Sequence, residues 1–208
     1  MLKPEHGKKD RIMIQSSEIC TAFFLFCDIR GFSRWMRENQ FEATELLDIF
    51  YTAGFEFFGE RKEQKYRKRV SKLLGDGFLA VHEYDPADRE GFNESLNRLI
   101  EGIAGFHGEF RRQLDSSTIH GRNQLHCAYG LSYGRGVRFN IPGYSLDYVS
   151  DRINFASRLA GVADSNEVVF EYDLWDQIDQ EKVSGKKEAE RDLKKIGLVK
   201  VGVYKAVS

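Results

Sequence analysis

Apolar residues along this chain recur in two patterns, one typical of buried strands and one typical of helices that pack on one face. The segment Ile19–Cys27 predicts a buried strand, because its centre is an uninterrupted apolar run. The segment Phe41–Gly59 predicts a helix with one apolar face. A longer helix is predicted from Pro86 to about Leu114, where apolar residues recur at alternating steps of four and three. These residues, which we expect in the core, are Phe92, Leu96, Leu99, Ile103, Phe106 and Phe110.

A glycine-rich segment between two apolar runs predicts a hairpin. Gly75, Asp76 and Gly77 form its turn, since glycine and aspartate tolerate the positive φ of a tight turn. We expect the strand that ends before Asp28 to pair beside this hairpin and bring Asp28 close to Asp76. Two neighbouring carboxylates repel each other unless a cation lies between them, and hard oxygen ligands suit Mg²⁺ or Mn²⁺.

The remaining segments alternate between strand and helix patterns. The predicted elements are a short helix capped by Ser33, a strand pair at Leu125–Tyr133 and Gly136–Phe139, a helix after Ser150, a strand at Glu167–Phe170, a short helix at Asp173–Ile178, a mobile charged segment at Gly185–Lys195, and one or two closing strands within Leu198–Val207. This order predicts an α+β fold, with helices packed on a mainly antiparallel central sheet. We assign residues 1–17 to a flexible N-terminal arm and residues 18–208 to one domain.

Composition and charge exclude several classes of partner. The chain has 208 residues, of which 30% are charged, and a net charge of −1, so neither a nucleic acid nor a bulk membrane surface is an expected partner. No apolar run approaches the ~20 residues of a membrane span, and no signal peptide is evident. The odd number of cysteines, Cys20, Cys27 and Cys127, lacks metal-ligand spacing and predicts reduced thiols in a cytoplasmic protein.

A polar pair on the helix after Ser150 adds candidate chemistry. Asn154 and Arg158 are four residues apart, so they lie one turn apart on the same face. Such a pair can be simply a solvent-exposed face. Together with Asp28 and Asp76, however, a guanidinium and an amide complete what phosphoryl transfer uses, because they stabilise the charge that builds on phosphorus.

Four segments in order carry a family resemblance. The segments Asp28–Ser33, Lys72–Gly77, Gly130–Gly136 and Asp147–Arg158 resemble the motifs of the class III nucleotide cyclase catalytic domain, over about Ile19 to Phe170. The resemblance implies a ferredoxin-like class III cyclase fold, which the domain at residues 18–208 would adopt as a homodimer. It also implies conversion of a nucleoside triphosphate to a 3′,5′-cyclic nucleotide and pyrophosphate.

The resemblance further implies roles for single residues. Asp28 and Asp76, with Ile29 beside them, would bind two Mg²⁺ or Mn²⁺ ions. Asn154 would orient the ribose and Arg158 would stabilise the transition state. The resemblance also implies that Arg135 and Lys200 would contact the phosphates, and that Lys72, Asp147 and Tyr51 would contact the base. The closing segment is shorter than the family's usual final hairpin, and Val149-Ser150 replaces a bulky residue and glycine, so the turn there can differ.

The family's site is shared between two chains, and the spacing of Lys72 and Asp76 favours the same arrangement here. Four residues of extended strand span roughly 13 Å, too far for both to face one small nucleotide. We therefore expect a homodimer with two composite sites, in which Asp76 serves one site and Lys72 the other.

The preferred base stays open at this point. Lys72 with Asp147 resembles the adenine-reading pair, but uracil, guanine and cytosine also present one donor next to one acceptor. Phe50 or Tyr51 could narrow the pocket to one ring, or both can be ordinary core residues. The chain resembles the short stand-alone pyrimidine cyclases of bacterial antiphage defence (Pycsar), which serve a separate effector protein. We therefore expect UTP or CTP as substrate and cyclic UMP or cyclic CMP as product. Cyclic AMP made from ATP is the alternative, and an inactive nucleotide-binding dimerisation module is a second one.

Overall fold

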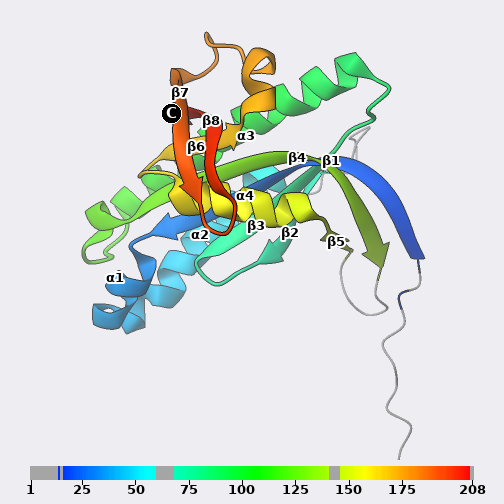
Figure 1. Ribbon diagram of the computed structural model, residues 1–208. Coiled ribbons are helices and arrows are strands. Elements are labelled where there is room, and N and C mark those ends of the chain that lie inside the picture. Colours follow the sequence, from blue (N-terminus) through cyan, green and yellow to red (C-terminus); the bar gives the residue numbers. More distant parts are fainter. Residues whose placement is uncertain (1–13, 15, 60–67, 141–145, 207–208) are drawn as a thin grey trace, which may run out of the picture.

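The computed structural model describes residue 14 and residues 16–59, 68–140 and 146–206, and Figure 1 shows their arrangement. The strands are β1 (Ser16–Arg30), β2 (Lys68–Leu73), β3 (Gly77–Glu83), β4 (His126–Asn140), β5 (Asp147–Val149), β6 (Glu167–Glu171), β7 (Ser184–Leu193) and β8 (Gly197–Lys205). The α-helices are α1 (Phe32–Glu38), α2 (Ala43–Phe58), α3 (Arg89–Ser116) and α4 (Asp151–Val162), and the 3₁₀ segments are η1 (Gln40–Glu42), η2 (Arg122–Gln124) and η3 (Tyr172–Gln177). Of the predicted N-terminal arm, residues 1–13 and 15 lie outside the described residues, whereas Ser16 and Ser17 belong to β1.

One sheet of eight strands organises the described chain. Its order is β2-β3-β1-β4-β6-β8-β7, and β5 pairs with β4 beside this path. The strand pairs are antiparallel except β4 with β6. The predicted α+β fold with a mainly antiparallel sheet is therefore confirmed. In the described ranges, no helix has the length and apolar character that a membrane crossing needs.

The central strand β1 separates two apolar layers, because successive side chains point to opposite faces of the sheet. Phe23 and Leu25 lie in the larger layer, to which α2 and α3 contribute. Ala22 and Phe24 lie in the smaller layer, together with residues of β5 and α4. In Figure 1, α4 (yellow) crosses in front of the sheet. Asp28 continues the even-numbered series of β1 and therefore belongs to the face that α4 covers.

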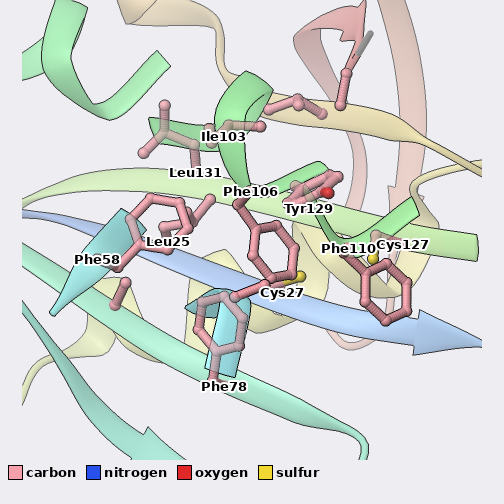
Figure 2. Close-up of a cluster of buried hydrophobic side chains, with 14 of the residues drawn as sticks. Leu25, Cys27, Phe58, Phe78, Ile103, Phe106, Phe110, Cys127, Tyr129 and Leu131 are labelled. Carbon is pink, nitrogen blue, oxygen red and sulfur yellow. The ribbon is translucent and has the colours of Figure 1, made fainter. Parts of the chain in front are cut away.

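Aromatic rings fill the larger layer. Phe78 of β3 meets Phe106 of α3 edge to face with ring centroids 5.3 Å apart, and Phe50 of α2 meets Phe110 at 5.5 Å. Figure 2 shows Phe58, Phe78, Phe106 and Phe110 around β1 and β4. The predicted stripe of the third helix is confirmed as core: Leu96, Leu99, Ile103, Phe106 and Phe110 are buried and Phe92 is half-buried.

The cysteines are free thiols, as predicted. Cys27 and Cys127 are fully buried, on the neighbouring strands β1 and β4 (Figure 2). Cys20 is only half-buried, because it lies near the end of β1 that projects beyond the helices.

One predicted break in a strand is wrong. The sequence predicts separate strands at Leu125–Tyr133 and Gly136–Phe139, but β4 is one continuous strand. Each of its residues has a partner on β1, so inter-strand hydrogen bonds carry the strand through Gly134. Gly136 is accommodated as well, because its missing side chain leaves room for the ring of Phe24, 3.2 Å from where a Cβ would lie.

The predicted mobility of the charged segment Gly185–Lys195 is also wrong. Most of this segment forms β7, the edge strand of the sheet, which pairs with β8. Charged side chains are typical of edge strands, since they face solvent and discourage pairing with other chains. β7 and β8 therefore form a complete closing hairpin, and the segment Leu198–Val207 supplies only its second strand.

Two helix starts differ from the prediction. Gly31, with a φ of 82°, precedes α1, so Ser33 lies inside this helix and is not its cap. The side chain of Asp88 caps α3, which therefore begins after Asp88 and not at Pro86. The short helix predicted at Asp173–Ile178 is the 3₁₀ segment η3.

Candidate active site

The two candidate metal-binding carboxylates converge at one edge of the fold. β1 pairs with β3 so that Asp28 lies opposite Gly77, the residue after Asp76. The backbone nitrogen of Ile29 donates a hydrogen bond of 2.8 Å to the carbonyl oxygen of Asp76. The prediction that the first strand lies beside the hairpin is therefore confirmed, and the register fixes both aspartates next to each other.

Glycine permits this close approach of the hairpin to β1. A Cβ on Gly77 would lie 2.7 Å from the carbonyl oxygen of Cys27, which is closer than side chains approach backbone atoms. Gly75 has a φ of 75°, a conformation that glycine adopts without steric cost. The turn closes with a hydrogen bond of 2.8 Å from the Leu74 nitrogen to the Gly77 oxygen. Within the Gly-Asp-Gly sequence, Gly75 therefore permits the turn, and Gly77 permits the close packing of the hairpin against β1.

The surroundings of Asp28 fit a cation. Its side chain is 27% exposed, and Arg30 lies 3.5 Å away from it. Burial raises the pKa of Asp28, the neighbouring Asp76 raises it further, and Arg30 lowers it. The carboxylate pair thus carries mutual repulsion that one guanidinium only partly offsets, and a divalent ion would relieve it.

The donor set suits magnesium or manganese. No group of three or more His, Cys, Asp or Glu side chains in the described ranges could hold a metal by itself. Mg²⁺ does not need such a group, because it binds through one or two carboxylates and takes further ligands from water and substrate phosphates. The side chain of Ile29 is apolar and only 2% exposed, so its backbone carbonyl is the atom it could offer. Asp28 and Asp76 therefore fit the predicted metal role.

A β-bulge aims Lys72 at the α4 face of the sheet. Val70 pairs with Ala80 but Lys72 pairs with Leu79, so two residues of β2 oppose one of β3. Val70 and Ala80 belong to the larger layer and Leu79 to the smaller one. In a regular strand without this bulge, Lys72 would share the face of Val70, because residues two apart point to the same side.

Lys72 meets Asp147 on this face. Its ammonium lies 3.1 Å from the Asp147 carboxylate, and the two side chains are 37% and 28% exposed. Asp147 reaches this place because Tyr148, the next residue of β5, is buried and donates a hydrogen bond of 2.6 Å to Glu83 of β3. Lys72 lies on β2 whereas Asp76 lies in the turn beyond it, so the expectation that both sit on one extended strand is wrong.

Helix α4 begins with a serine cap and packs tightly on the sheet. The Ser150 hydroxyl accepts a hydrogen bond from the Arg152 nitrogen at 3.1 Å and donates one to the Arg135 oxygen at 2.7 Å. The turn at Val149-Ser150 is therefore well formed with serine at this position. Farther along, a Cβ on Gly130 of β4 would lie 2.0 Å from the Ala156 oxygen. The absence of a side chain at Gly130 therefore sets how closely α4 approaches β4.

Asn154 and Arg158 lie on the side of α4 opposite to the sheet. Ala156 and Ala160 are buried against β4, and Arg158, midway between them, is about 200° of helical rotation from each. Asn154 is exposed and Arg158 half-buried. Within the described part of the chain, neither side chain has a hydrogen-bond or ion-pair partner. Both polar groups are therefore available to a ligand that approaches from outside the protomer.

Solved structures of cyclase domains share the fold of this chain. The guanylyl cyclase Cya2 matches with a TM-score of 0.66 at 17% identity over 93% of each chain. The adenylyl cyclase CyaB from P. aeruginosa matches with 0.64 at 16% identity, over 93% of this chain and 96% of that one. The catalytic core of a rhodopsin-guanylyl cyclase with converted specificity, in complex with ATPαS, matches with 0.65 at 13% identity, over 92% and 99%. The chain has the class III cyclase fold.

This likeness is one of fold, because the identities are low. By sequence, no protein family and no curated protein matches the chain. The similar structures include both guanylyl and adenylyl cyclases, so the class III cyclase fold by itself does not select a base.

Tyr51 lies beside the carboxylates in this class III cyclase fold. Its phenol, on α2, donates a hydrogen bond to the carbonyl oxygen of Gly75. Burial raises the pKa of Tyr51, and the nearby Asp76 raises it further. The structure therefore brings Tyr51 to the turn that carries Asp76, and its predicted contact with the base stays a prediction.

Arg135 and Lys200 are not brought to the carboxylates within one chain. Arg135 pairs with Thr21 of β1, seven residues from Asp28, which is roughly 23 Å along an extended strand. It is exposed and lines a cavity of about 390 Å³. Lys200 lies 2.8 Å from Glu188 and 3.9 Å from the ring centroid of Tyr172. The positive charge of Lys200 is thus already partnered on the closing hairpin.

Sequence reasoning did not single out the cations at the tip of the closing hairpin. Lys194 and Lys195 are exposed at the turn between β7 and β8, the part of the hairpin without a partner strand. Their signal was a pair of lysines before a glycine, Gly197, whose φ is 98°. Arg30 was also missed, although its place two residues after Asp28 puts both side chains on one face of β1.

Proposed function

We propose that this protein is a nucleotide cyclase that converts a nucleoside triphosphate into a 3′,5′-cyclic nucleotide and pyrophosphate. The observation that carries the proposal is the β1–β3 register, which pairs Asp28 with Gly77 and so brings it next to Asp76. The class III cyclase fold supports it, since the similar structures are guanylyl and adenylyl cyclases and one of them holds ATPαS.

Two copies of the chain would share each site. Asn154 and Arg158 lie on the side of α4 opposite to the sheet that carries their own Asp28, so one protomer cannot turn all of these groups toward one ligand. In a twofold dimer, the carboxylates of one copy would face the amide and guanidinium of the other. Lys72 pairs with Asp147 of its own chain, and this pair would join the half of the site that α4 supplies.

The division of labour follows from the chemistry of each side chain. Asp28 and Asp76 would hold two Mg²⁺ or Mn²⁺ ions, which neutralise the phosphates and lower the pKa of the ribose 3′-hydroxyl. Asn154 would orient the ribose by hydrogen bonding. Arg158 would donate to the phosphate oxygens on which charge builds as pyrophosphate leaves, an interaction that is strongest in the transition state. Arg135 or Lys200 would contact the triphosphate only if the dimer brings it there.

For the base we propose a pyrimidine, with UTP before CTP. The phenol of Tyr51, fixed on the Gly75 carbonyl, supports a pocket narrowed near the turn, and the Lys72–Asp147 pair offers one donor and one acceptor to a ring edge. Cyclic UMP or cyclic CMP would then act on a separate effector in antiviral defence. ATP is the second candidate substrate, because the same lysine and aspartate also match the donor and acceptor of adenine.

Two experiments test the proposal. The protein is incubated with ATP, GTP, CTP or UTP and Mg²⁺ or Mn²⁺, and any cyclic product is identified by mass. A cyclic pyrimidine nucleotide is expected; cyclic AMP alone would refute the pyrimidine assignment, and nucleotide binding without pyrophosphate release would favour an inactive binding module. Next, Asp76→Ala and Arg158→Ala chains, each inactive alone, are mixed. Mixed dimers should regain activity through one intact site, and no recovery in confirmed mixed dimers would contradict the shared site.

A further inference from the structure

Arg30 links two elements that carry different parts of the chemistry. One terminal nitrogen of its guanidinium, Nη1, lies 3.5 Å from the Asp28 carboxylate. The other, Nη2, donates a hydrogen bond to the carbonyl oxygen of Ala160 in α4. Nε is buried without a partner among the described residues. The guanidinium is thus held at its two ends, by the strand that carries Asp28 and by the helix that carries Arg158.

The contact with α4 is favourable for a cation. Ala160 lies in the last turn of the helix, where carbonyl oxygens carry partial negative charge, and its oxygen also accepts a hydrogen bond of 3.2 Å from the Ala163 nitrogen. Ala160 is two residues from Arg158, and α4 is rigidly seated here because the Ala160 nitrogen would lie 2.3 Å from a Cβ on Gly130. A shift of Arg30 would therefore be felt at the part of α4 that presents Arg158.

We propose that Arg30 serves both composite sites of the dimer: its charge offsets the metal-binding carboxylate of one site, and it positions the end of α4 that presents the transition-state arginine of the other. This rests on the proposed function, in which Asp28 and Arg158 of one chain belong to different sites. Only a forked guanidinium can make both contacts, because a lysine ammonium is a single point of charge.

The two contacts predict separable effects. At Asp28, Arg30 opposes a second cation, so its removal should strengthen metal binding, by about two- to five-fold for a half-exposed ion pair. At Ala160, loss of the hydrogen bond should let the end of α4 move and lower kcat with little change in KM, since Arg158 acts on the transition state. If Arg30 served only the local fold, its replacement would change thermal stability without these separate effects on metal binding and on kcat.

The first test measures Mn²⁺ binding to the full-length protein without nucleotide, by electron paramagnetic resonance. Arg30→Gln should bind Mn²⁺ two- to five-fold more tightly than the native protein, whereas Arg30→Lys, which keeps the charge, should bind it as before. Arg34→Gln is the matched control, since this arginine is exposed on α1, and it should change nothing. Unchanged binding in Arg30→Gln, in a variant that unfolds at the native temperature, would overturn the role at Asp28.

The second test places Arg30→Lys in one chain of the mixed dimer described above. In that dimer, the Arg158→Ala chain gives the intact site its carboxylates, and the Asp76→Ala chain gives it Arg158. Arg30→Lys in the Asp76→Ala chain should lower kcat about tenfold or more, with the Mn²⁺ dependence unchanged. Unaltered kcat there would overturn the double role. If the mixed dimer were inactive even with native Arg30, the shared site itself would fail, which is a different result.

Discussion

Replacing Gly130 by alanine tests how the seating of α4 on the sheet controls chemistry. The added Cβ would lie 2.0 Å from the Ala156 oxygen and 2.3 Å from the Ala160 nitrogen. Both atoms belong to the helix backbone, so no side-chain rotation can relieve the overlap. Ordinary contact begins near 3.4 Å, and the helix would therefore have to retreat by more than ~1 Å.

The expected cost has two parts. Overpacking of this kind destabilises a fold by about 1–3 kcal/mol, which for a domain of this size lowers Tm by roughly 2–10 °C. The retreat also displaces Asn154 and Arg158, and a misplacement of ~1 Å at reacting groups can cost about 100-fold in rate. We expect Gly130→Ala to remain folded at 25 °C and to lose about 100-fold in kcat.

The assay combines urea unfolding with the rate of pyrophosphate release. Gly161→Ala is the matched control, because Gly161 lies on the same helix and a Cβ there meets nothing within 4 Å. Alanine in the helix should raise stability by about 0.4–1 kcal/mol with native kcat. If Gly130→Ala kept native stability and native kcat, the close approach of α4 to β4 would not control the position of Arg158, and the reasoning would be refuted.

Two further predictions concern the turn that carries Asp76 and the strand β5 that carries Asp147. Gly77→Ala should push the turn away from β1, which lowers stability by about 1–3 kcal/mol and weakens Mn²⁺ binding measured by calorimetry. In Gly75→Ala the new Cβ meets nothing within 4 Å, so this variant should lose only the ~1–2 kcal/mol of a left-handed alanine. Equal Mn²⁺ affinity in both variants would contradict this reasoning. Tyr148→Phe removes the donor to Oε1 of the buried Glu83, whose Oε2 still accepts a hydrogen bond from Arg138, and should cost about 1–3 kcal/mol in urea unfolding. Since Tyr148 also holds β5 in place, KM should rise more than kcat falls, and a pure kcat effect would argue against a role for β5 in binding the base.

The carboxylate edge could be predicted from the sequence because local signals agreed there. Gly75, Asp76 and Gly77 specify a turn, and Asp28 ends an apolar strand. Each signal lies within a few residues, and the one long-range step was the hypothesis that the first strand pairs beside the hairpin, which the β1–β3 register confirms. The helical spacing of Asn154 and Arg158 was equally local, and their shared face follows from it.

Features set by backbone approach could not be predicted in the same way. Alternation from Val70 would put Lys72 in the larger core layer, and only the extra residue at Ser71 turns it toward Asp147. No composition signal marks this bulge. Strand β7 was likewise hidden, because its charged residues suit solvent and give no apolar periodicity, while backbone hydrogen bonds form its ladder with β8.

These cases give a physical reason why a fold of this kind can persist while its sequence diverges. The candidate site residues are positioned by a bulge, by two glycines that admit a neighbouring backbone, and by one guanidinium, Arg30, that joins strand to helix. Such constraints involve few residues and leave the rest of the core free to be repacked, which is consistent with a shared fold at 13–17% identity. Substitutions at Gly77 and Gly130 should therefore be far more damaging to activity than replacements of equal size among the aromatic residues of the core, where a volume-conserving change costs less than about 1.5 kcal/mol.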